Sequence, residues 1–220
     1  MINIAIDGTA GSGKSTVAKL LASKMNFKLL NTGEIYRSLA CAYHEEFDCE
    51  PTIQNIEKFL KNKIIEIKFV DFNQFVFVNG VCYKEKLRTE EISILTSKIS
   101  VFQSLRNKVL SIQRDFAKEN NCIMEGRDIG TIVLPNANIK FFITASQEER
   151  ARRRFLQVKD CETTYEMVLE DLKERDYRDI NREVAPLKPA PDSIIIDNTS
   201  MTIDENVEMC LKIINEIKVR

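Results

Sequence analysis

The sequence contains no tryptophan, one histidine, five prolines and seven glycines among its 220 residues. It has no excess of charge of either sign, because 32 Lys and Arg against 33 Asp and Glu leave a formal net charge of −1 at pH 7. Proteins that bind nucleic acids or membrane surfaces usually carry a strongly basic region. We therefore expect no nucleic acid and no membrane among its partners. His44 lies beside acidic residues, and we expect a surface position without acid–base chemistry.

The cysteines are scattered and form no C-x-x-C pair, which disfavours a zinc site or a disulfide framework. Their positions are Cys41, Cys49, Cys82, Cys122, Cys161 and Cys210. No apolar run approaches the length of a membrane span, and the first run, Ile2–Ile6, ends at Asp7 and is too short for a signal segment. We expect a soluble cytoplasmic protein, a monomer, with buried reduced thiols.

A complete phosphate-binding motif, G-x-x-x-x-G-K-[ST], occupies Gly8 to Ser15. An apolar strand pattern precedes it and a helical pattern follows it, which is the context that the motif requires. Glycines allow successive N–H groups to face one anion at the start of a helix. Lys14 is then placed to reach the outer phosphates, and the Ser15 hydroxyl to bind Mg²⁺. The phosphate loop predicted to bind a nucleoside triphosphate comprises Gly8, Thr9, Ala10, Gly11, Ser12, Gly13, Lys14, Ser15 and Thr16.

Strand and helix patterns alternate along most of the chain, which is typical of a parallel sheet covered by helices. Predicted core strands are Ile2–Ile6, Lys28–Leu30, Asn121–Met124, Lys140–Thr144 and Ser193–Asp197. Predicted helices are Ser15–Met25, a helix that begins near Gly33 and runs through Tyr43, Glu90–Phe102, Ser104–Asn120, Gln147–Lys159, Tyr165–Tyr177 and Ile203–Lys218. The stretch around Pro51 is interpreted as a polar connector.

Residues 63–103 interrupt this alternation. Strand patterns at Ile64–Val70, Phe75–Val78 and Val81–Tyr83, with the turn Asn79-Gly80, predict a small antiparallel sheet. We expect an inserted subdomain that moves relative to a core of residues 1–62 and 104–220. A meander packed permanently on the core is the alternative.

Polar groups follow two predicted core strands directly. Thr32-Gly33 and Arg127-Asp128 each stand at a strand's carboxyl end, the edge at which open parallel sheets bind ligands. Arg37 and Arg106 fit the same site, although their spacing fits surface arginines equally well. Tyr36 fits either stacking on a base or packing in the core.

Arginines are concentrated in two predicted helical arms, which together suggest a lid at about residues 150–178. The first arm carries Arg150, Arg152, Arg153 and Arg154, and the second carries Arg175, Arg178 and Arg182. Arg178 and Arg182 are four residues apart and are expected to share a helix face. Phosphoryl transfer between two anions depends on cations that align them and stabilise the transition state. The alternative is a pair of solvated helices with internal ion pairs, because acidic residues lie among the arginines.

The chain resembles the bacterial-type cytidylate kinases over nearly its whole length, including the insert. The resemblance rests on D-G-T-A-G-S-G-K-S-T at 7–16, T-G-x-x-Y-R at 32–37, L-R-T at 87–89, E-G-R-D-x-G-T at 125–131, K-E-R-D-x-R-D-x-N-R at 173–182 and V-A-P-L at 184–187. Two positions depart from the usual pattern: Asn31 replaces an aspartate, and Thr9 replaces a frequent proline.

The resemblance implies an α/β fold, the three-layer P-loop kinase fold, with a central parallel five-stranded sheet, a small antiparallel β insert and a helical lid. It implies transfer of the γ-phosphoryl group of ATP, with Mg²⁺, to CMP or dCMP. By matching positions, the acceptor site would consist of a base set (Thr32, Arg106, Asp128, with Tyr36 nearby), a phosphate set (Arg37, Arg127, Arg182) and a sugar set (Arg175, Asp179). Lys14, Arg127, Arg182 and the lid residues Arg153 and Arg154 would be catalytic, and Ser15 would bind the metal.

No protein general base is expected, because the attacking phosphate oxygen is already ionised near neutral pH. Other acceptors, such as UMP, AMP or a small alcohol like shikimate, remain alternatives within the enzyme class. A GTPase would need an N-K-x-D element, and an ABC-type ATPase an L-S-G-G-Q stretch. The sequence contains neither.

Overall fold

The computed structural model describes residues 1–47, 49–87, 89–157 and 163–218. A five-stranded sheet with the order β2-β6-β1-β7-β8 lies at the centre, and every neighbouring pair of strands is parallel. Its strands are β1 (Asn3–Gly8), β2 (Lys28–Asn31), β6 (Cys122–Glu125), β7 (Ile139–Thr144) and β8 (Ile194–Asp197). Short, almost continuously apolar runs suit strands that are covered on both faces. The predicted central parallel sheet is confirmed.

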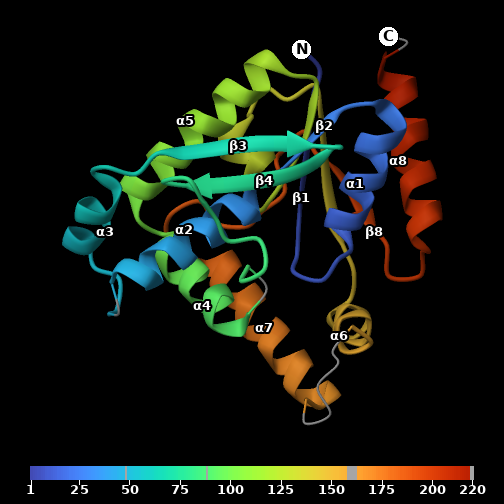
Figure 1. Cartoon of the computed structure of the whole chain (residues 1–220). Coiled ribbons are helices and arrows are strands. Elements are labelled where there is room, and N and C mark those ends of the chain that lie inside the picture. The colour runs from blue at the N-terminus through green and yellow to red at the C-terminus, as the bar shows by residue number, and fades with distance from the viewer. Residues whose placement is uncertain (48, 88, 158–162, 219–220) are drawn as a thin grey trace.

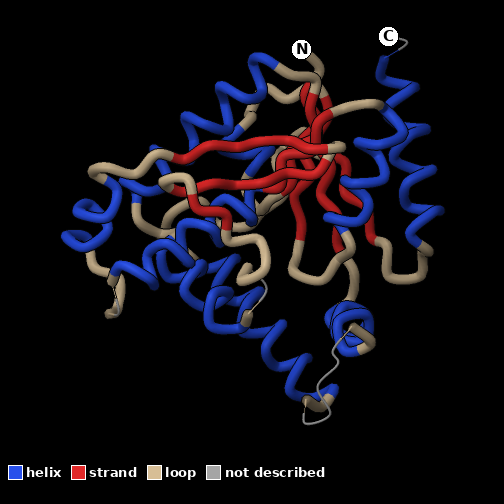
Figure 2. The backbone as a smooth tube through the Cα atoms, viewed as in Figure 1, coloured by secondary structure: helices blue, strands red, loops and turns tan. Residues whose placement is uncertain are grey.

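Helices cover both faces of this sheet and make three layers (Figures 1 and 2). Helices α1 (Lys14–Met25) and α8 (Ile203–Lys218) lie on one face, and α2 (Thr32–Glu46) and α5 (Gln103–Glu119) on the other. Successive side chains of a strand point to opposite faces. Ile4 and Ile6 of β1 therefore pack with the α1–α8 side, whereas Ala5 packs with the α2–α5 side.

A second sheet, of three antiparallel strands, lies on the α2 side of the molecule. It consists of β3 (Ile65–Val70), β4 (Asn73–Val78) and β5 (Val81–Cys82), followed by α4 (Glu90–Ile99). Asn79 and Gly80 have φ values of 50° and 81°, the left-handed pair that a type I′ hairpin turn requires. The predicted turn is confirmed. Val76 and Val78 belong to the same buried cluster as Ala5.

The remaining element boundaries differ from the expectations in several places. Helix α3 (Ile53–Leu60) fills the stretch interpreted as a connector, because Thr52 caps it by accepting from Asn55 N, while Ile56, Phe59 and Leu60 are buried. Helix α4 ends earlier than predicted, and α7 (Tyr165–Asn181) extends four residues beyond Tyr177. Helix α6 spans Gln147–Phe155. Arg88 and residues 158–162, which include the predicted end of that helix, lie outside the described residues.

The described cysteines are all free thiols. Cys41, Cys122 and Cys210 are buried as expected, whereas Cys49 and Cys82 are exposed, so the expectation of burial is wrong for these two. Cys161 lies outside the described residues. Within the described part of the chain, no helix combines the length and the apolar character that crossing a membrane would demand.

Candidate active site

The phosphate loop connects β1 to α1 and is closely packed. A Cβ on Gly8 would lie 1.9 Å from the Ile143 carbonyl oxygen, so only glycine fits there. Gly13, with φ at 81°, is the residue that precedes α1. Lys14 is 7% exposed, and its Nζ donates to the Thr9 carbonyl at 3.3 Å. Burial, followed by the charge of Arg127, lowers the pKa of Lys14 to about 7. Bound anionic phosphate would restore the charged form.

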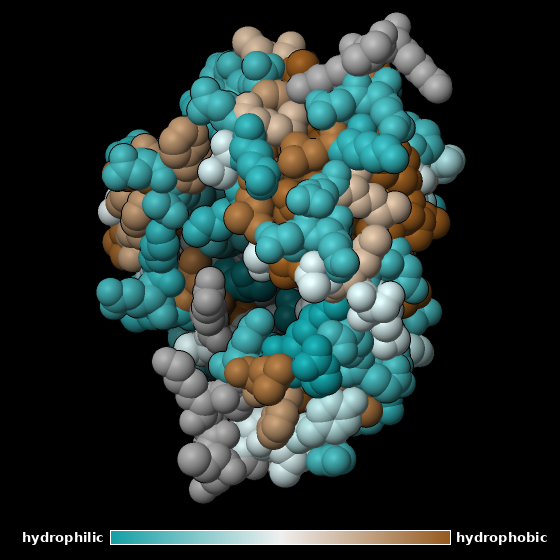
Figure 3. Space-filling model, turned by 90° about the vertical axis from the view of Figure 1, so that its right-hand side faces the viewer, coloured by the Kyte–Doolittle hydropathy of each residue, from teal (hydrophilic) through white to brown (hydrophobic). Residues whose placement is uncertain are grey.

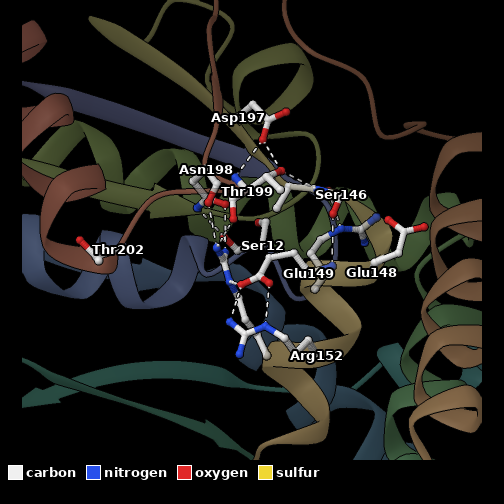
Figure 4. A network of polar contacts seen from close by, with 12 residues as sticks. Ser12, Ser146, Glu148, Glu149, Arg152, Asp197, Asn198, Thr199 and Thr202 are labelled. Carbon is white, nitrogen blue, oxygen red and sulfur yellow. Dashed lines mark hydrogen bonds and ion pairs between the residues drawn. The ribbon is translucent and has the colours of Figure 1, made fainter.

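The outer side of the phosphate loop is held by a polar network (Figure 4). Asn198, after β8, donates through Nδ2 to the Ser12 carbonyl at 2.8 Å. Arg153 of α6 donates to Asn198 Oδ1 at 3.0 Å and to its carbonyl at 2.8 Å. Glu149 accepts from Arg153 and from Arg152. The loop can thus keep its N–H groups facing inward because its carbonyls are bound from behind.

A second contact from α6 reaches the loop directly. The Arg150 guanidinium is 3% exposed and donates to the Ala10 carbonyl at 2.9 Å and to the Ala145 carbonyl at 2.9 Å. Its remaining nitrogen lies 2.7 Å from Asp176 Oδ2 on α7. Arg150 was predicted as a lid residue, but it is a buried link between the phosphate loop, α6 and α7.

At the start of α1, Ser15 Oγ donates to Glu125 Oε2 at 2.8 Å. Glu125 ends β6, the strand beside β1, and is 3% exposed. A hydroxyl and a carboxylate together are the oxygen ligands that Mg²⁺ prefers. The residues present therefore fit a magnesium ion. Sequence reasoning named Ser15 for this role and missed Glu125, although the E-G-R-D motif contains it.

Beside the phosphate loop opens the arginine cleft, at the carboxyl edge of β2 and β6. Figure 3 shows a hollow with hydrophilic walls on the face it displays. The strand order reverses at β1, next to β6, and the carboxyl ends of strands at such a point are the usual ligand position in open α/β sheets. The lining residues of the cleft are Lys14, Ser15, Asn31, Thr32, Gly33, Tyr36, Arg37, Thr96, Ser97, Ser100, Arg106, Glu125, Gly126, Arg127, Asp128, Arg175, Asp179 and Arg182.

Cationic side chains outnumber carboxylates in the arginine cleft. Arg127 Nε lies 2.8 Å from Asp179 Oδ2, and Arg106 is bonded to Asp128. Arg182 Nη2 is 3.9 Å from Asp128 Oδ1 and has no hydrogen-bond acceptor among the described residues. Burial, followed by the charge of Arg127, lowers the pKa of Arg175 to about 10. A partly desolvated set of repelling guanidinium groups favours binding of an anion.

Asp128 is presented by an unusual turn. Val133 N donates to the Asp128 carbonyl at 3.1 Å and Leu134 N to the Ile129 carbonyl at 2.7 Å, a single turn of π-helix over Ile129–Val133. A Cβ on Gly126 would lie 2.6 Å from Thr32 Oγ1, so glycine allows the two strand ends to approach. Such π turns are frequent at functional sites, and no sequence pattern predicted this one.

Every residue predicted for the acceptor site lines the arginine cleft, although these residues are spread along the chain between Thr32 and Arg182. Arg153 and Arg154 do not belong to its described lining; Arg153 is engaged in the network above, and Arg154 is exposed on α6. Arg178 does not share a face with Arg182, because α7 ends at Asn181 and Arg182 is extended.

Other lining residues come from α4 and had no sequence signal. Thr96, Ser97 and Ser100 face the cleft because the insert folds back over α2, and Arg106 Nη1 donates to the Ser100 carbonyl at 3.3 Å. Tyr36 lines the cleft and also packs against the core, so the packing is confirmed and stacking on a base stays a prediction. His44 lies away from the site, 3.5 Å from Glu91.

The family model for cytidylate kinase matches residues 4–216. The chain belongs to the cytidylate kinase family. It is 42% identical over 218 residues to a cytidylate kinase of Caldicellulosiruptor saccharolyticus, covering 98% of this chain and 96% of the relative. It is 46% identical over 215 residues to a cytidylate kinase of Thermosipho melanesiensis, covering 97% and 96%. An uncharacterized protein from Eubacterium ventriosum has a similar fold, with a TM-score of 0.55 and 17% identity over 98% of this chain and 99% of that one.

Family membership confirms the resemblance that the motifs predicted. It also gives a context for Asn31, which lines the arginine cleft. The Asn31 side chain caps α2 by accepting from Glu34 N at 3.1 Å, a role that asparagine and aspartate fill about equally well. The departure from the cytidylate kinase pattern therefore preserves the helix cap and removes one negative charge from the cleft.

Proposed function

We propose that this protein transfers the γ-phosphoryl group of ATP to CMP or dCMP. The observation that carries the proposal is the convergence of Arg37, Arg106, Arg127 and Arg182, from distant parts of the chain, on one cleft beside Lys14. A phosphoryl transfer between two anions requires this arrangement, because positioning and charge stabilisation supply most of the catalysis.

Cytosine is proposed to lie against Asp128 and Arg106. A carboxylate accepts from the exocyclic amine of cytosine, and the corresponding carbonyl of uracil would meet the same carboxylate unfavourably. Thr32 Oγ1 donates to the Glu125 carbonyl at 2.8 Å and is left with lone pairs that can accept from the base. The hydroxyls of Ser97 and Ser100 supply further polar groups on the α4 side.

The acceptor phosphate is proposed to bind Arg37, Arg127 and Arg182, and the sugar Arg175 and Asp179. Guanidinium groups form paired hydrogen bonds with phosphate oxygens, which fixes the orientation of the attacking oxygen. Lys14 and the N–H groups of the phosphate loop would hold the transferred group. No general base is needed, because the acceptor oxygen is ionised.

Ser15 and Glu125 are proposed to hold Mg²⁺ with ATP, as their oxygen donors suit this ion. When bound, the ion would neutralise charge that develops on the phosphate oxygens. The Glu125 carboxylate would then face the ion instead of accepting from the Ser15 hydroxyl. Lys14 would be protonated beside the phosphates.

We also propose that residues 63–103 and a lid of about 150–178 close over the substrates and exclude water. Arg153 and Arg154 would reach the nucleotide only after such a movement. The insert's shared core with Ala5 and the engagement of Arg153 favour small movements over large ones. We propose that the protein works as a monomer in the cytoplasm. Light scattering of the purified protein measures its molar mass and so tests whether it is a monomer.

The test is the formation of ADP and of the nucleoside diphosphate with ATP and each of CMP, dCMP, UMP and AMP, with shikimate as a non-nucleotide acceptor. We expect CMP and dCMP to be the best acceptors, and removal of Mg²⁺ with a chelator to abolish turnover. Preference for UMP, AMP or shikimate, or ATP hydrolysis without a phosphorylated product, would overturn the proposal.

A further inference from the structure

Asp7 immediately precedes the phosphate loop, but its side chain bonds to the turn that follows Asp128, on the acceptor side of the site. The residue lies near the end of β1 and is 4% exposed. Its Oδ1 accepts from Ile129 N at 2.8 Å, and its Oδ2 accepts from Gly130 N at 2.7 Å. Both amides belong to the turn that directly follows Asp128. One carboxylate therefore connects the base of the phosphate loop to the segment that carries the cytosine-reading residue.

The turn is packed tightly onto this carboxylate. A Cβ on Gly130 would lie 3.1 Å from Lys140 Cδ and 3.4 Å from Asp7 Oδ2, so the backbone is as close as a glycine permits. These two amides begin the π turn over Ile129–Val133, which sets the direction of Asp128. A shift of the turn would move Arg127 and Asp128 together relative to Lys14.

We propose that Asp7 is a positioning residue that sets the acceptor-reading turn at a fixed distance from the phosphate loop. It contacts neither nucleotide and acts through the backbone of Ile129 and Gly130. The inference rests on the proposed function, because it concerns the alignment of CMP with ATP. Misplacement of a reacting group by about 1 Å costs on the order of a hundredfold in rate, so a strut between the two sites has a large effect on catalysis.

The hold of Asp7 on the turn depends on pH, because it depends on the ionisation of the Asp7 carboxylate. Burial raises the pKa of Asp7 to about 6, against the opposing effect of the two N–H bonds. Among nearby charges, Asp128 raises this pKa and Arg127 lowers it. Lys140 is bonded elsewhere, to the Pro135 carbonyl and to Asp192. The ionised carboxylate accepts both amides, whereas a protonated one presents an O–H to an N–H and releases one of them.

The test compares Asp7→Asn with Asp192→Asn. The first substitution removes one acceptor from the turn, because the amide NH₂ faces an N–H. The second weakens the ion pair of the neighbouring Lys140, at 2.7 Å, without touching the turn's amides. For Asp7→Asn we expect kcat/KM for CMP to fall about a hundredfold and the ratio of kcat/KM for CMP over UMP to fall about fivefold, with KM for ATP changed less than about twofold. Asp192→Asn should keep the wild-type ratio.

An Asp7→Asn variant that is folded by circular dichroism and keeps the CMP-to-UMP ratio would overturn the inference. If this variant does not fold, the wild type decides: its CMP-to-UMP ratio should fall below about pH 6 and stay level up to about pH 8. Taking the ratio cancels the titration of the nucleotide phosphate, which both acceptors share. A level ratio down to about pH 5 would overturn the inference. Absence of CMP turnover in the wild type would instead defeat the proposed function.

Discussion

The phosphate loop and the arginine cleft lie side by side, but they are built in opposite ways. The loop is one continuous stretch in which main-chain N–H groups do the binding, and Asn198 and Arg150 hold its carbonyls from outside. The cleft is lined by side chains that come from β2, α2, α4, α5, β6 and α7. A loop of backbone amides binds the phosphates that all nucleoside triphosphates share, whereas a set of side chains can distinguish one acceptor from another.

The two regions also differ in how their polar and charged groups are paired when no substrate is bound. The Ser12 and Ala10 carbonyls of the loop are held by bonds from Asn198 and Arg150, while the cleft collects guanidinium groups that repel each other. Arg182 is an example: burial, outweighing the attraction of Asp128, lowers its pKa. Anionic substrates relieve this repulsion, so we expect ligand binding to stabilise the cleft more than the loop. Substitutions in each region test this difference.

The largest effect is expected for Lys14→Met, at the junction of the two regions. Removing the cation that holds the transferred group should lower kcat at least about a hundredfold. Because Lys14 is buried with a pKa near 7, the apolar replacement should not reduce the melting temperature. Stopped-time product assays and thermal unfolding measure the two quantities. Near-normal turnover would remove Lys14 from the mechanism.

Arg127→Ala should lower kcat at least about a hundredfold, because it removes a cation that holds the acceptor phosphate. The substitution also leaves Asp179 buried without its partner, which should cost about 1–3 kcal/mol of unfolding free energy. Arg178→Ala is the matched control, since this arginine is exposed on α7 next to Asp179. Calorimetric titration with ATP should give similar affinity for wild type and Arg127→Ala. Equal loss of ATP binding would erase the distinction between loop and cleft.

Asn198→Ala tests the loop side. The variant loses the bond to the Ser12 carbonyl and the one that Arg153 donates to Asn198 Oδ1, so KM for ATP should rise about tenfold while KM for CMP stays near its normal value. Asn138→Ala is a suitable control, because the Asn138 side chain also bonds to the main chain, but it accepts from Asn3 N at 2.8 Å, at the end of β1 far from the loop. Equal effects of both variants on KM for ATP would mean that the network around Asn198 has no special role.

Gln74→Ala tests how the insert is coupled to the cleft. The Gln74 amide accepts from Asn31 N at 2.8 Å and donates to the Asn31 carbonyl at 3.0 Å, which extends the free edge of β2. Loosening Asn31 should displace the start of α2 with Thr32 and Arg37, raising KM for CMP about fivefold with KM for ATP unchanged. Asn73→Ala, an exposed neighbour on β4, should behave as wild type. An unchanged KM for CMP in Gln74→Ala would uncouple the insert from the acceptor site.

The smallest effect is expected for Glu149→Gln, which alters the network behind the loop without entering either site. Hydrogen bonds from Arg152 and Arg153 lower the pKa of Glu149 from 4.5 to about 2. A carboxylate with a lowered pKa stabilises the fold above its unfolded value, and this contribution is lost as pH falls from about 4.5 to about 2. Near neutral pH the variant should lose less than about 1 kcal/mol of unfolding free energy, measured by chemical denaturation. In the acid window its unfolding free energy should depend less on pH than that of the wild type. An unfolding free energy that depends on pH equally in Glu149→Gln and in the wild type between about pH 4.5 and pH 2 would contradict this.

Sequence reasoning succeeded where short-range patterns govern structure. The apolar run before Gly8, the helical spacing after it and the Asn79-Gly80 turn each have a local physical cause, and each element formed as expected. It failed for α3, where the polar composition around Pro51 concealed a narrow apolar face. It also failed for the π turn after Asp128, because such a turn is stabilised by Asp7, far away in the sequence.

The roles of the arginines divide along the same line. The G-R-D and R-D-x-N-R motifs indicated which residues line the cleft, yet nothing in a helical stretch of arginines separates Arg150, which is buried against Ala10 and Asp176, from exposed Arg154. Whether a guanidinium becomes a structural link or stays available depends on what packs against its helix. Thr96, Ser97 and Ser100 were missed for the same reason: α4 reaches the cleft only through the path of the insert.

The sequence alone determined the presence of the phosphate loop and the alternation of strands and helices, because both depend on residues that are neighbours along the chain. The tertiary structure decided the composition of the cleft, the burial of Arg150 and the partners of Asp7. Those properties depend on which segments meet across the sheet edge, and that meeting is set by strand order and core packing.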